Sequence, residues 1–253
     1  MVTVKIDGRE IQTEKGRSLL EVARSAGINI PALCYHPAVS SYGSCRTCIV
    51  EVRRKGSYVL TASCTYPVEH NIEVQTNSER VKKARGLVVE MLLARCPEVQ
   101  SIREMAAEMG ITATRLPQGD SNCILCGLCV RVCSEVIGAN AIGFSGRGLD
   151  KKATSPFEIA SAECIGCGAC AIVCPTQAIR IDDVNGFRRV NLSHAELERA
   201  VCTVCGASFF PTASIAHLKK IGAGGLLDLS GVCPTCRRKN VARVLGRTSS
   251  GDK

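Results

Sequence analysis

The sequence predicts an α+β chain that consists of several small modules rather than one large domain. Three observations lead to this expectation. The 253 residues include seventeen cysteines, far above ordinary usage. Five phenylalanines, four tyrosines and no tryptophan leave little material for a single large core. Segments that alternate apolar and polar residues, as strands do, are separated by segments with helical apolar spacing.

The high cysteine content also bears on the cellular compartment in which the protein works. A disulfide framework is the competing explanation for so many thiols. The chain opens directly on a strand-like segment, Met1–Gly8, without a signal peptide. No apolar run approaches the roughly eighteen residues of a membrane span. We therefore expect a reducing, cytoplasmic location, where cysteines act as metal ligands.

Residues 1–78 are expected to form a β-grasp domain. The segment Val2–Ile11 alternates apolar and polar residues around a hairpin signal at Asp7-Gly8. Ser18 and Glu21 form a capping box at the start of a short helix. Further strand-like segments follow a cysteine-rich loop, at 49–52, 58–62 and 72–75.

Four cysteines of this domain have a spacing close to the plant-type C-x4-C-x2-C…C pattern, with ten residues in the first gap. They are Cys34, Cys45, Cys48 and Cys64. We expect them to hold a [2Fe–2S] cluster, with a four-cysteine zinc site as the alternative. His36 is a conceivable Rieske-type ligand, but four cysteines suffice, so we interpret it as a loop residue.

Residues 79–118 have helical apolar spacing, interrupted at Pro97 and closed at Gly110, and so predict a helical connector. Cys96 is the one cysteine that belongs to none of the predicted ligand sets, and we interpret it as a buried, inert thiol.

Residues 119–185 contain the motif C-x2-C-x2-C-x3-C twice, with an insertion at 143–163 that is expected to include a small hairpin. In bacterial two-cluster ferredoxins the fourth cysteine of each such run ligates the other cluster. One [4Fe–4S] cluster is therefore assigned to Cys123, Cys126, Cys129 and Cys174. The other is assigned to Cys164, Cys167, Cys170 and Cys133. Zinc knuckles are the alternative, although zinc does not favour a triple motif followed by Cys-Pro.

The C-terminal module, residues 193–245, contains two C-x2-C knuckles separated by twenty-seven residues. Its cysteines are Cys202, Cys205, Cys233 and Cys236. We expect a small zinc-ribbon or rubredoxin-like module with Zn²⁺ in a tetrahedral S4 site. A single rubredoxin-type iron and a further cluster are the alternatives. Ser193 and Glu196 match a capping box, which predicts a helix at the start of this module.

The net charge of +9 does not by itself indicate nucleic-acid binding. Sixteen thiolate ligands and four metal centres of formal charge +2 bring the loaded protein close to neutrality.

The order of [2Fe–2S] module, helical connector and two-cubane module resembles the N-terminal part of the large iron–sulfur subunit of respiratory complex I. It is similar too to the diaphorase small subunit of NAD-reducing hydrogenases, and to the N-termini of some formate dehydrogenases and iron-only hydrogenases. The resemblance covers residues 1–183, and is strongest in the twelve iron–sulfur cysteines and in CILCGLCVRVCSEVIGANAIGFSGRG and CIGCGACAIVCPTQAI. These relatives usually carry another cubane in the connector, held by one His and three Cys. Here Met91–Pro97 has one cysteine and the next is Cys123, so that cluster should be absent.

The resemblance implies an electron-transfer subunit of a multi-subunit soluble oxidoreductase, between a flavin subunit that handles NAD(P)H and a partner reductase, hydrogenase or formate dehydrogenase. The residues agree, because we find no Gly-rich dinucleotide fingerprint and no nucleophile–base pair. We therefore assign no catalytic residue. A free-standing polyferredoxin is one alternative. A cluster-bearing nucleic-acid-binding module is less favoured, because aromatic stacking residues are nearly absent.

Overall fold

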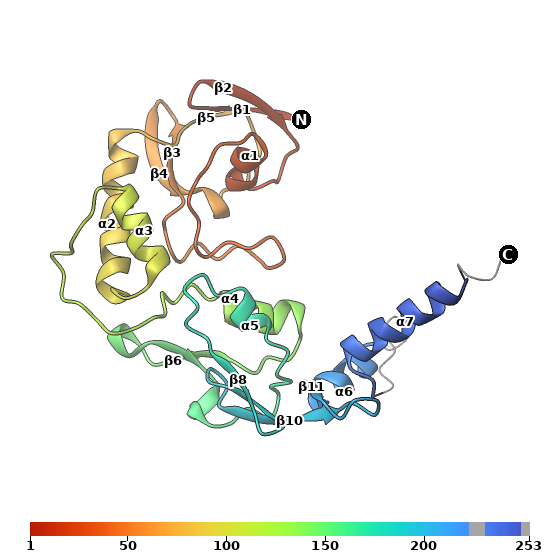
Figure 1. Cartoon of the computed structure of the whole chain (residues 1–253). Helices are drawn as coiled ribbons and strands as arrows, with labels where there is room; N and C mark the ends of the chain where they lie inside the picture. Colours follow the sequence, from red (N-terminus) through yellow and green to blue (C-terminus); the bar gives the residue numbers. More distant parts are fainter. Residues whose placement is uncertain (223–230, 249–253) are drawn as a thin grey trace.

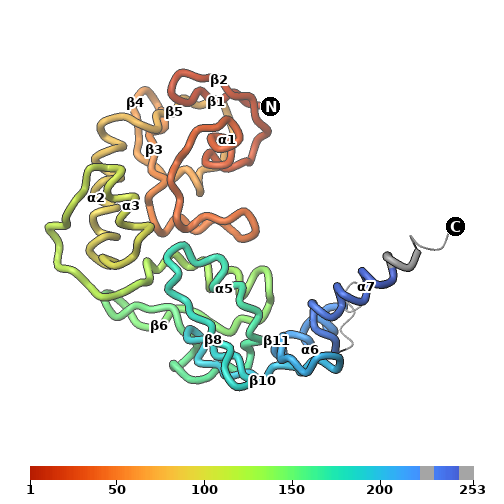
Figure 2. The backbone as a smooth tube through the Cα atoms, viewed as in Figure 1, coloured from red at the N-terminus to blue at the C-terminus, as the bar shows by residue number. Residues whose placement is uncertain are grey.

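The computed structural model describes residues 1–222 and 231–248 of the chain. Figure 1 shows an arc, with the N-terminal sheet at one end, a pair of helices beside it and a second sheet at the other end. The tube in Figure 2 follows the same path, ending in a C-terminal helix that projects away from the arc. Part of the predicted C-terminal module, 223–230, lies outside the described residues.

The N-terminal module is a five-stranded sheet of order β2-β1-β5-β3-β4 with one helix packed against it. Its elements are β1 (Val2–Ile6), β2 (Arg9–Thr13), α1 (Leu19–Ser25), β3 (Ile49–Arg54), β4 (Ser57–Ala62) and β5 (Ile72–Gln75). β1 pairs in parallel with β5, and the other neighbours pair antiparallel. The predicted hairpin is confirmed: Asp7 and Gly8, with φ of 47° and 87°, connect β1 to β2. The capping box of Ser18 and Glu21 is confirmed as well.

The predicted helical connector consists of α2 (Glu79–Arg95) and α3 (Gln100–Glu108), which pack against each other. α2 ends before the Cys96-Pro97 pair, because proline cannot continue the backbone hydrogen bonding of a helix. The buried Arg85 fixes α2 to the sheet, since its Nη2 donates to the carbonyls of Ile49 and Thr76 at 2.7 and 3.3 Å.

The two-cluster region contains two short helices, each of which follows a glycine with positive φ, 72° at Gly127 and 81° at Gly168. They are α4 (Leu128–Arg131), which continues into a π-helical turn (Val132–Val136), and α5 (Ala169–Ile172). The insertion forms the predicted small hairpin, with strands β6 (Gly143–Ser145) and β7 (Lys152–Thr154). After the second run, β8 (Ile181–Val184) and β9 (Phe187–Val190) form another hairpin.

The helix predicted from Ser193 and Glu196 is wrong, because Ser193 lies in a turn and Glu196 in the strand that follows it, β10 (Ala195–Val201). Glu196 pairs with Arg189 of β9, and β10 extends the hairpin into a sheet of order β11-β10-β9-β8. Sheet pairing overrides the local capping signal, as tertiary context often does. The Ser193 hydroxyl donates a hydrogen bond to a cysteine sulfur instead of capping a helix.

The C-terminal module is mixed rather than an all-strand ribbon in its described residues. Besides β10, its elements are β11 (Ser208–Pro211), α6 (Thr212–Lys220) and α7 (Pro234–Thr248). The first knuckle occupies the turn between β10 and β11, and the second knuckle opens α7. Figure 1 shows α7 extending from this end of the chain.

Candidate metal centres

The four cysteines of the N-terminal module are all buried. Three lie on the long segment between α1 and β3, and Cys64 lies in a 3-10 turn after β4. Cys48 Sγ is 3.4 Å from Cys64 Sγ, and this contact lowers the pKa of Cys48 to about 6. Hydrogen bonds from the Cys45 and Cys64 thiols also lower the pKa of Cys34. The same contacts raise the pKa of the partner thiols Cys45 and Cys64, so the four sulfurs are closely coupled. Four clustered cysteine sulfurs are the donor set of a [2Fe–2S] cluster, so this set fits one.

His36, on the same segment, uses its Nδ1 to accept the backbone N–H of Ala38 at 3.2 Å. This contact agrees with its interpretation as a loop residue.

A first cavity in the two-cluster region is lined by Cys123, Cys126, Cys129 and Cys174. The Leu125 N–H donates to Cys123 Sγ at 3.4 Å, and the Thr176 hydroxyl lies 3.6 Å from Cys174 Sγ. Hydrogen bonds of this kind to ligand sulfurs orient the ligands and influence the reduction potential of a bound cluster. Four thiols around one cavity fit a cubane, which requires four thiolate ligands.

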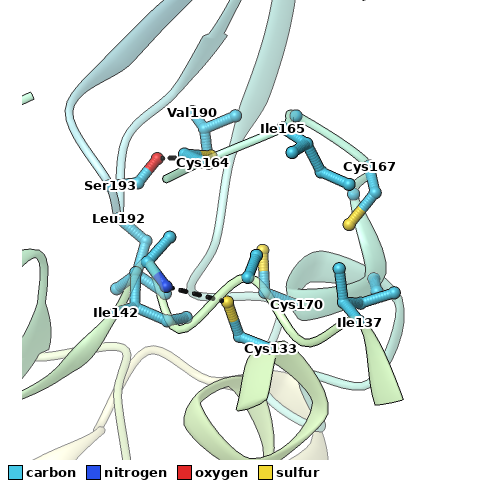
Figure 3. A pocket seen from close by; sticks show the side chains of 15 residues that line it. Cys133, Ile137, Ile142, Cys164, Ile165, Cys167, Cys170, Val190, Leu192 and Ser193 are labelled. Carbon is cyan, nitrogen blue, oxygen red and sulfur yellow. Dashed lines mark hydrogen bonds between the residues drawn. The ribbon is translucent and has the colours of Figure 1, made fainter. Parts of the chain in front are cut away.

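A second cavity is lined by Cys133, Cys164, Cys167 and Cys170, together with apolar side chains that include Ile137, Ile142, Ile165 and Val190 (Figure 3). The Ala141 N–H donates to Cys133 Sγ at 3.3 Å, and the Ser193 hydroxyl donates to Cys164 Sγ at 3.1 Å. Burial raises the pKa of Cys170 to about 12, whereas Cys167 is exposed. Each cavity therefore takes three cysteines from one run and the fourth from the other.

The C-terminal cysteines Cys202, Cys205, Cys233 and Cys236 have sulfur atoms that all lie within 4.8 Å of one another. Cys205 Sγ and Cys233 Sγ are 3.8 Å apart. This separation is close to the edge of a tetrahedron with metal–sulfur bonds of about 2.3 Å. The N–H groups of Cys233 and Cys236 donate to Cys202 Sγ and Cys233 Sγ at 3.3 and 3.4 Å. The donor set fits one tetrahedral metal ion, and zinc and iron both accept it.

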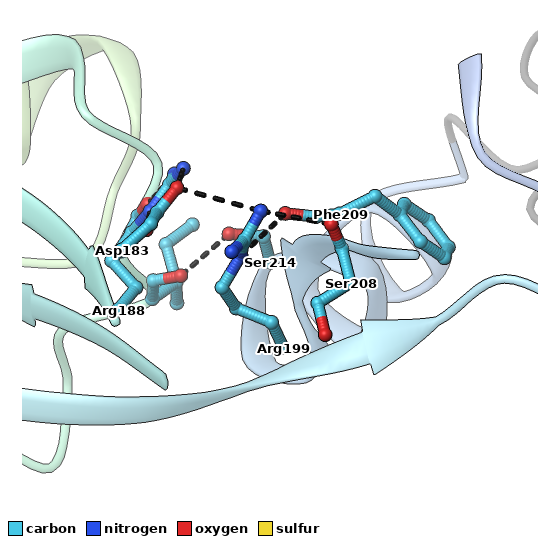
Figure 4. A network of polar contacts seen from close by, with 8 residues as sticks. Asp183, Arg188, Arg199, Ser208, Phe209 and Ser214 are labelled. Carbon is cyan, nitrogen blue, oxygen red and sulfur yellow. Dashed lines mark hydrogen bonds and ion pairs between the residues drawn. The ribbon is translucent and has the colours of Figure 1, made fainter. Parts of the chain in front are cut away.

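A polar network connects this C-terminal module to the second cavity (Figure 4). Arg188 binds Asp183 through two bonds of 2.8 Å and donates to the Gly166 carbonyl at 3.0 Å. Arg199 donates to the Phe209 and Ser208 carbonyls at 2.9 Å. The Ser214 hydroxyl of α6 donates to the Ile165 carbonyl at 2.5 Å. Ile165 and Gly166 separate two cysteines of the second cavity, so the module directly supports their loop.

The remaining cysteine, Cys96, is fully buried at the end of α2, and burial raises its pKa to about 11. A thiol with this pKa stays protonated and unreactive at neutral pH. No histidine or other cysteine occurs between Cys96 and Cys123 in the sequence.

Sequence reasoning missed two residues that the structure places at the cysteine sets. Ser193 was interpreted as a helix cap, and Arg131, whose guanidinium lies beside Cys34 and Cys126, was not singled out. The contact of Ser193 with Cys164 spans 29 residues and that of Arg131 with Cys34 spans 97, so neither contact has a local signal in the sequence.

Comparisons with known proteins identify iron–sulfur domains in the chain. Residues 1–79 match the 2Fe-2S iron-sulfur cluster binding domain, and residues 163–209 match the 4Fe-4S dicluster domain. In a crystal structure of NAD⁺-reducing [NiFe]-hydrogenase in the H2-reduced state, one chain is similar with a TM-score of 0.54 and 30% identity. The match covers 61% of this chain and 74% of that one. The chain therefore belongs to the same family of iron–sulfur subunits as that hydrogenase chain.

Other members of the family are longer. The 78 kDa subunit of mitochondrial NADH-ubiquinone oxidoreductase from Candida albicans is 36% identical over 176 residues, which is 59% of this chain and 24% of that protein. The NADP-reducing hydrogenase subunit HndD from Solidesulfovibrio fructosivorans is 32% identical over 211 residues, 71% of this chain and 36% of that protein. The matched part of the chain thus spans 24% to 36% of the length of these curated relatives.

Within the described residues, none of the helices is both long and apolar enough to cross a membrane.

Proposed function

We propose that the chain is the electron-transfer subunit of a multi-subunit oxidoreductase in the cytoplasm. It relays single electrons through one [2Fe–2S] and two [4Fe–4S] clusters. Its partners are a flavoprotein subunit that binds NAD(P)H and a terminal reductase, hydrogenase or formate dehydrogenase. The iron ligands are the twelve cysteines of the three sets described above. When bound, the clusters supply the redox chemistry, and the chain supplies their spacing, hydrogen bonds and exclusion of water.

The observation that carries this proposal is the direct succession of the three cysteine sets. Cys34 and Cys45 of the first set share one buried apolar cluster with Cys126 of the second. The second and third sets are joined by one short helical segment, because Cys129 lies in α4 and Cys133 in the π-helical turn that continues it. An electron relay requires such adjacent centres, whereas nucleic-acid binding does not.

The same proposal assigns Zn²⁺ and a structural role to Cys202, Cys205, Cys233 and Cys236, because a closed four-cysteine site is typical of structural zinc. Rubredoxin-type iron is the alternative. The modules remain 1–78, 79–118, 119–185 and 193–245, although β10 continues the sheet of β8 and β9 across the last boundary.

Metal analysis and affinity purification test the proposal together. Anaerobically purified protein should contain about ten iron and ten acid-labile sulfide ions per chain, because the three clusters contribute two, four and four. One zinc should accompany them. About fourteen iron ions would instead reveal a connector cluster. Purification from the native host should recover a flavoprotein. A protein with all three clusters that elutes alone as a monomer would favour the free polyferredoxin.

A further inference from the structure

Arg131 is an arginine buried between two of the cysteine sets. It is the last residue of α4, between Cys129 and Cys133, and is only 8% exposed. Arginine is rarely buried unless its donors and its charge are compensated. Its partners therefore indicate its role.

The guanidinium joins the ligand loops of two different predicted clusters. Its Nη2 donates to the carbonyl of Cys34 at 2.8 Å and to the carbonyl of Cys126 at 3.3 Å. Cys34 belongs to the N-terminal set and Cys126 to the first cavity of the two-cluster region. Nη1 donates to the carbonyl of Ser40, on the same segment as Cys34. A planar guanidinium makes these contacts at once, which the single ammonium of lysine does not.

Other contacts hold the same two loops together. The Ser44 hydroxyl donates to the Cys126 carbonyl at 3.2 Å. The Tyr42 ring lies 5.4 Å from the guanidinium carbon of Arg131. Gly127, at φ +72°, would bring an added Cβ within 3.5 Å of the same ring. The loops therefore meet at close contact, with Arg131 between them.

The positive charge of Arg131 makes no ion pair with a carboxylate in residues 1–222 and 231–248. Glu135, one turn further on, accepts instead from the N–H and hydroxyl of Ser40 at 2.6 and 2.7 Å. An arginine side chain carries a full positive charge in proteins. Because it is buried, its field is weakly screened and acts on negative charge at either cluster.

We propose that Arg131 is the positioning residue for electron transfer between the [2Fe–2S] cluster and the cubane of Cys123, Cys126, Cys129 and Cys174. The inference rests on the proposed function. One electron leaves the reduced cluster of this pair and enters the oxidised one, and no bond to Arg131 forms or breaks. The proposed complex supplies the electron at one end and removes it at the other. The charge of Arg131 raises both reduction potentials, and its bridge fixes the separation of the two clusters.

EPR-monitored redox titration of the intact, cluster-loaded chain tests this inference in three variants. Arg131→Met removes charge and bridge, and Arg131→Lys keeps the charge alone. Arg95→Met is the matched control, because Arg95 Nε donates to the Cys123 carbonyl at 2.7 Å and so contacts the loop of one cluster only.

Arg131→Met should lower the potentials of the [2Fe–2S] cluster and the first cubane, shift the second cubane less, and weaken the magnetic interaction between the first two. Arg131→Lys should retain the potentials but weaken the interaction. Arg95→Met should shift the potential of the first cubane alone.

An Arg131→Met variant that melts at a lower temperature with unchanged potentials would overturn the inference, because the role of Arg131 would then be structural. If Arg131→Met loses its clusters, Arg131→Lys decides the question. An unchanged magnetic interaction between the [2Fe–2S] cluster and the first cubane in Arg131→Lys would then overturn the inference. Failure of the proposed function is distinguishable, because the unmodified chain would then lack one of the three EPR signals.

Discussion

Removal of the Ser193 hydroxyl should lower the reduction potential of the cubane in the second cavity. Ser193 is buried at 1% exposure, and its Oγ donates to Cys164 Sγ at 3.1 Å. A hydrogen bond to a ligand sulfur stabilises the more electron-rich, reduced cluster, and so raises the potential. Ser193→Ala removes this donor and leaves the backbone bond from Ser161 N–H to the Ser193 carbonyl in place.

The size of the shift follows from the strength of one hydrogen bond. The free energy of a hydrogen bond to a charged acceptor reasonably differs by about 1 kcal/mol between the oxidised and the reduced cluster. For one electron, about 59 mV is a tenfold change in equilibrium constant, and a tenfold change is about 1.4 kcal/mol. The expected decrease is therefore about 40 mV, on the same conversion.

The assay is an EPR redox titration of Ser193→Ala beside Thr176→Val. Thr176 is the matched control, because its hydroxyl lies 3.6 Å from Cys174 Sγ in the other cavity. That variant should shift the first cubane, by a smaller amount, since the contact is longer. An unchanged potential in Ser193→Ala, or an equal shift of both cubanes, would refute the reasoning.

Three further predictions concern ligands and stability. Cys133→Ala should damage the cubane bound by the Cys164 run and spare the other, and EPR showing loss of only the Cys123-run cubane would contradict the grouping. Replacing Cys233 and Cys236 by Ser should remove one metal ion per chain and weaken complex assembly, with the [2Fe–2S] signal unchanged. Retention of that ion in metal analysis would count against the site. Hydrogen bonds from Arg115 lower the pKa of Glu90 to about 2, whereas an unfolded carboxyl titrates at about 4.3. The carboxylate thus stabilises the fold above pH ~4.3, a contribution lost as the pH falls toward 2. In acid unfolding followed by circular dichroism, Glu90→Gln should lack that part of the pH dependence. Identical unfolding curves for Glu90→Gln and the unmodified chain would disprove the role of Glu90.

Much of the N-terminal module could be predicted because its signals are local. The hairpin at Asp7-Gly8 depends on positive φ at adjacent residues, and the capping box of Ser18 and Glu21 spans one helical turn. Cysteine spacing is also a local signal, since each run of C-x2-C-x2-C presents its thiols from one short loop. These features specify donor chemistry and module order without knowledge of the rest of the chain.

Only the tertiary structure decided what surrounds the cysteines, because those contacts join residues far apart in sequence. Ser193 carries the local pattern of a helix cap, yet pairing of β10 with β9 places its hydroxyl at Cys164. Nothing in the local sequence distinguishes Arg131, but the approach of the N-terminal loop buries it against Cys34. The structure places the two knuckles of the C-terminal module in a hairpin turn and at a helix start, which the sequence did not reveal, since knuckle spacing specifies a tetrahedral site and not the elements that carry it.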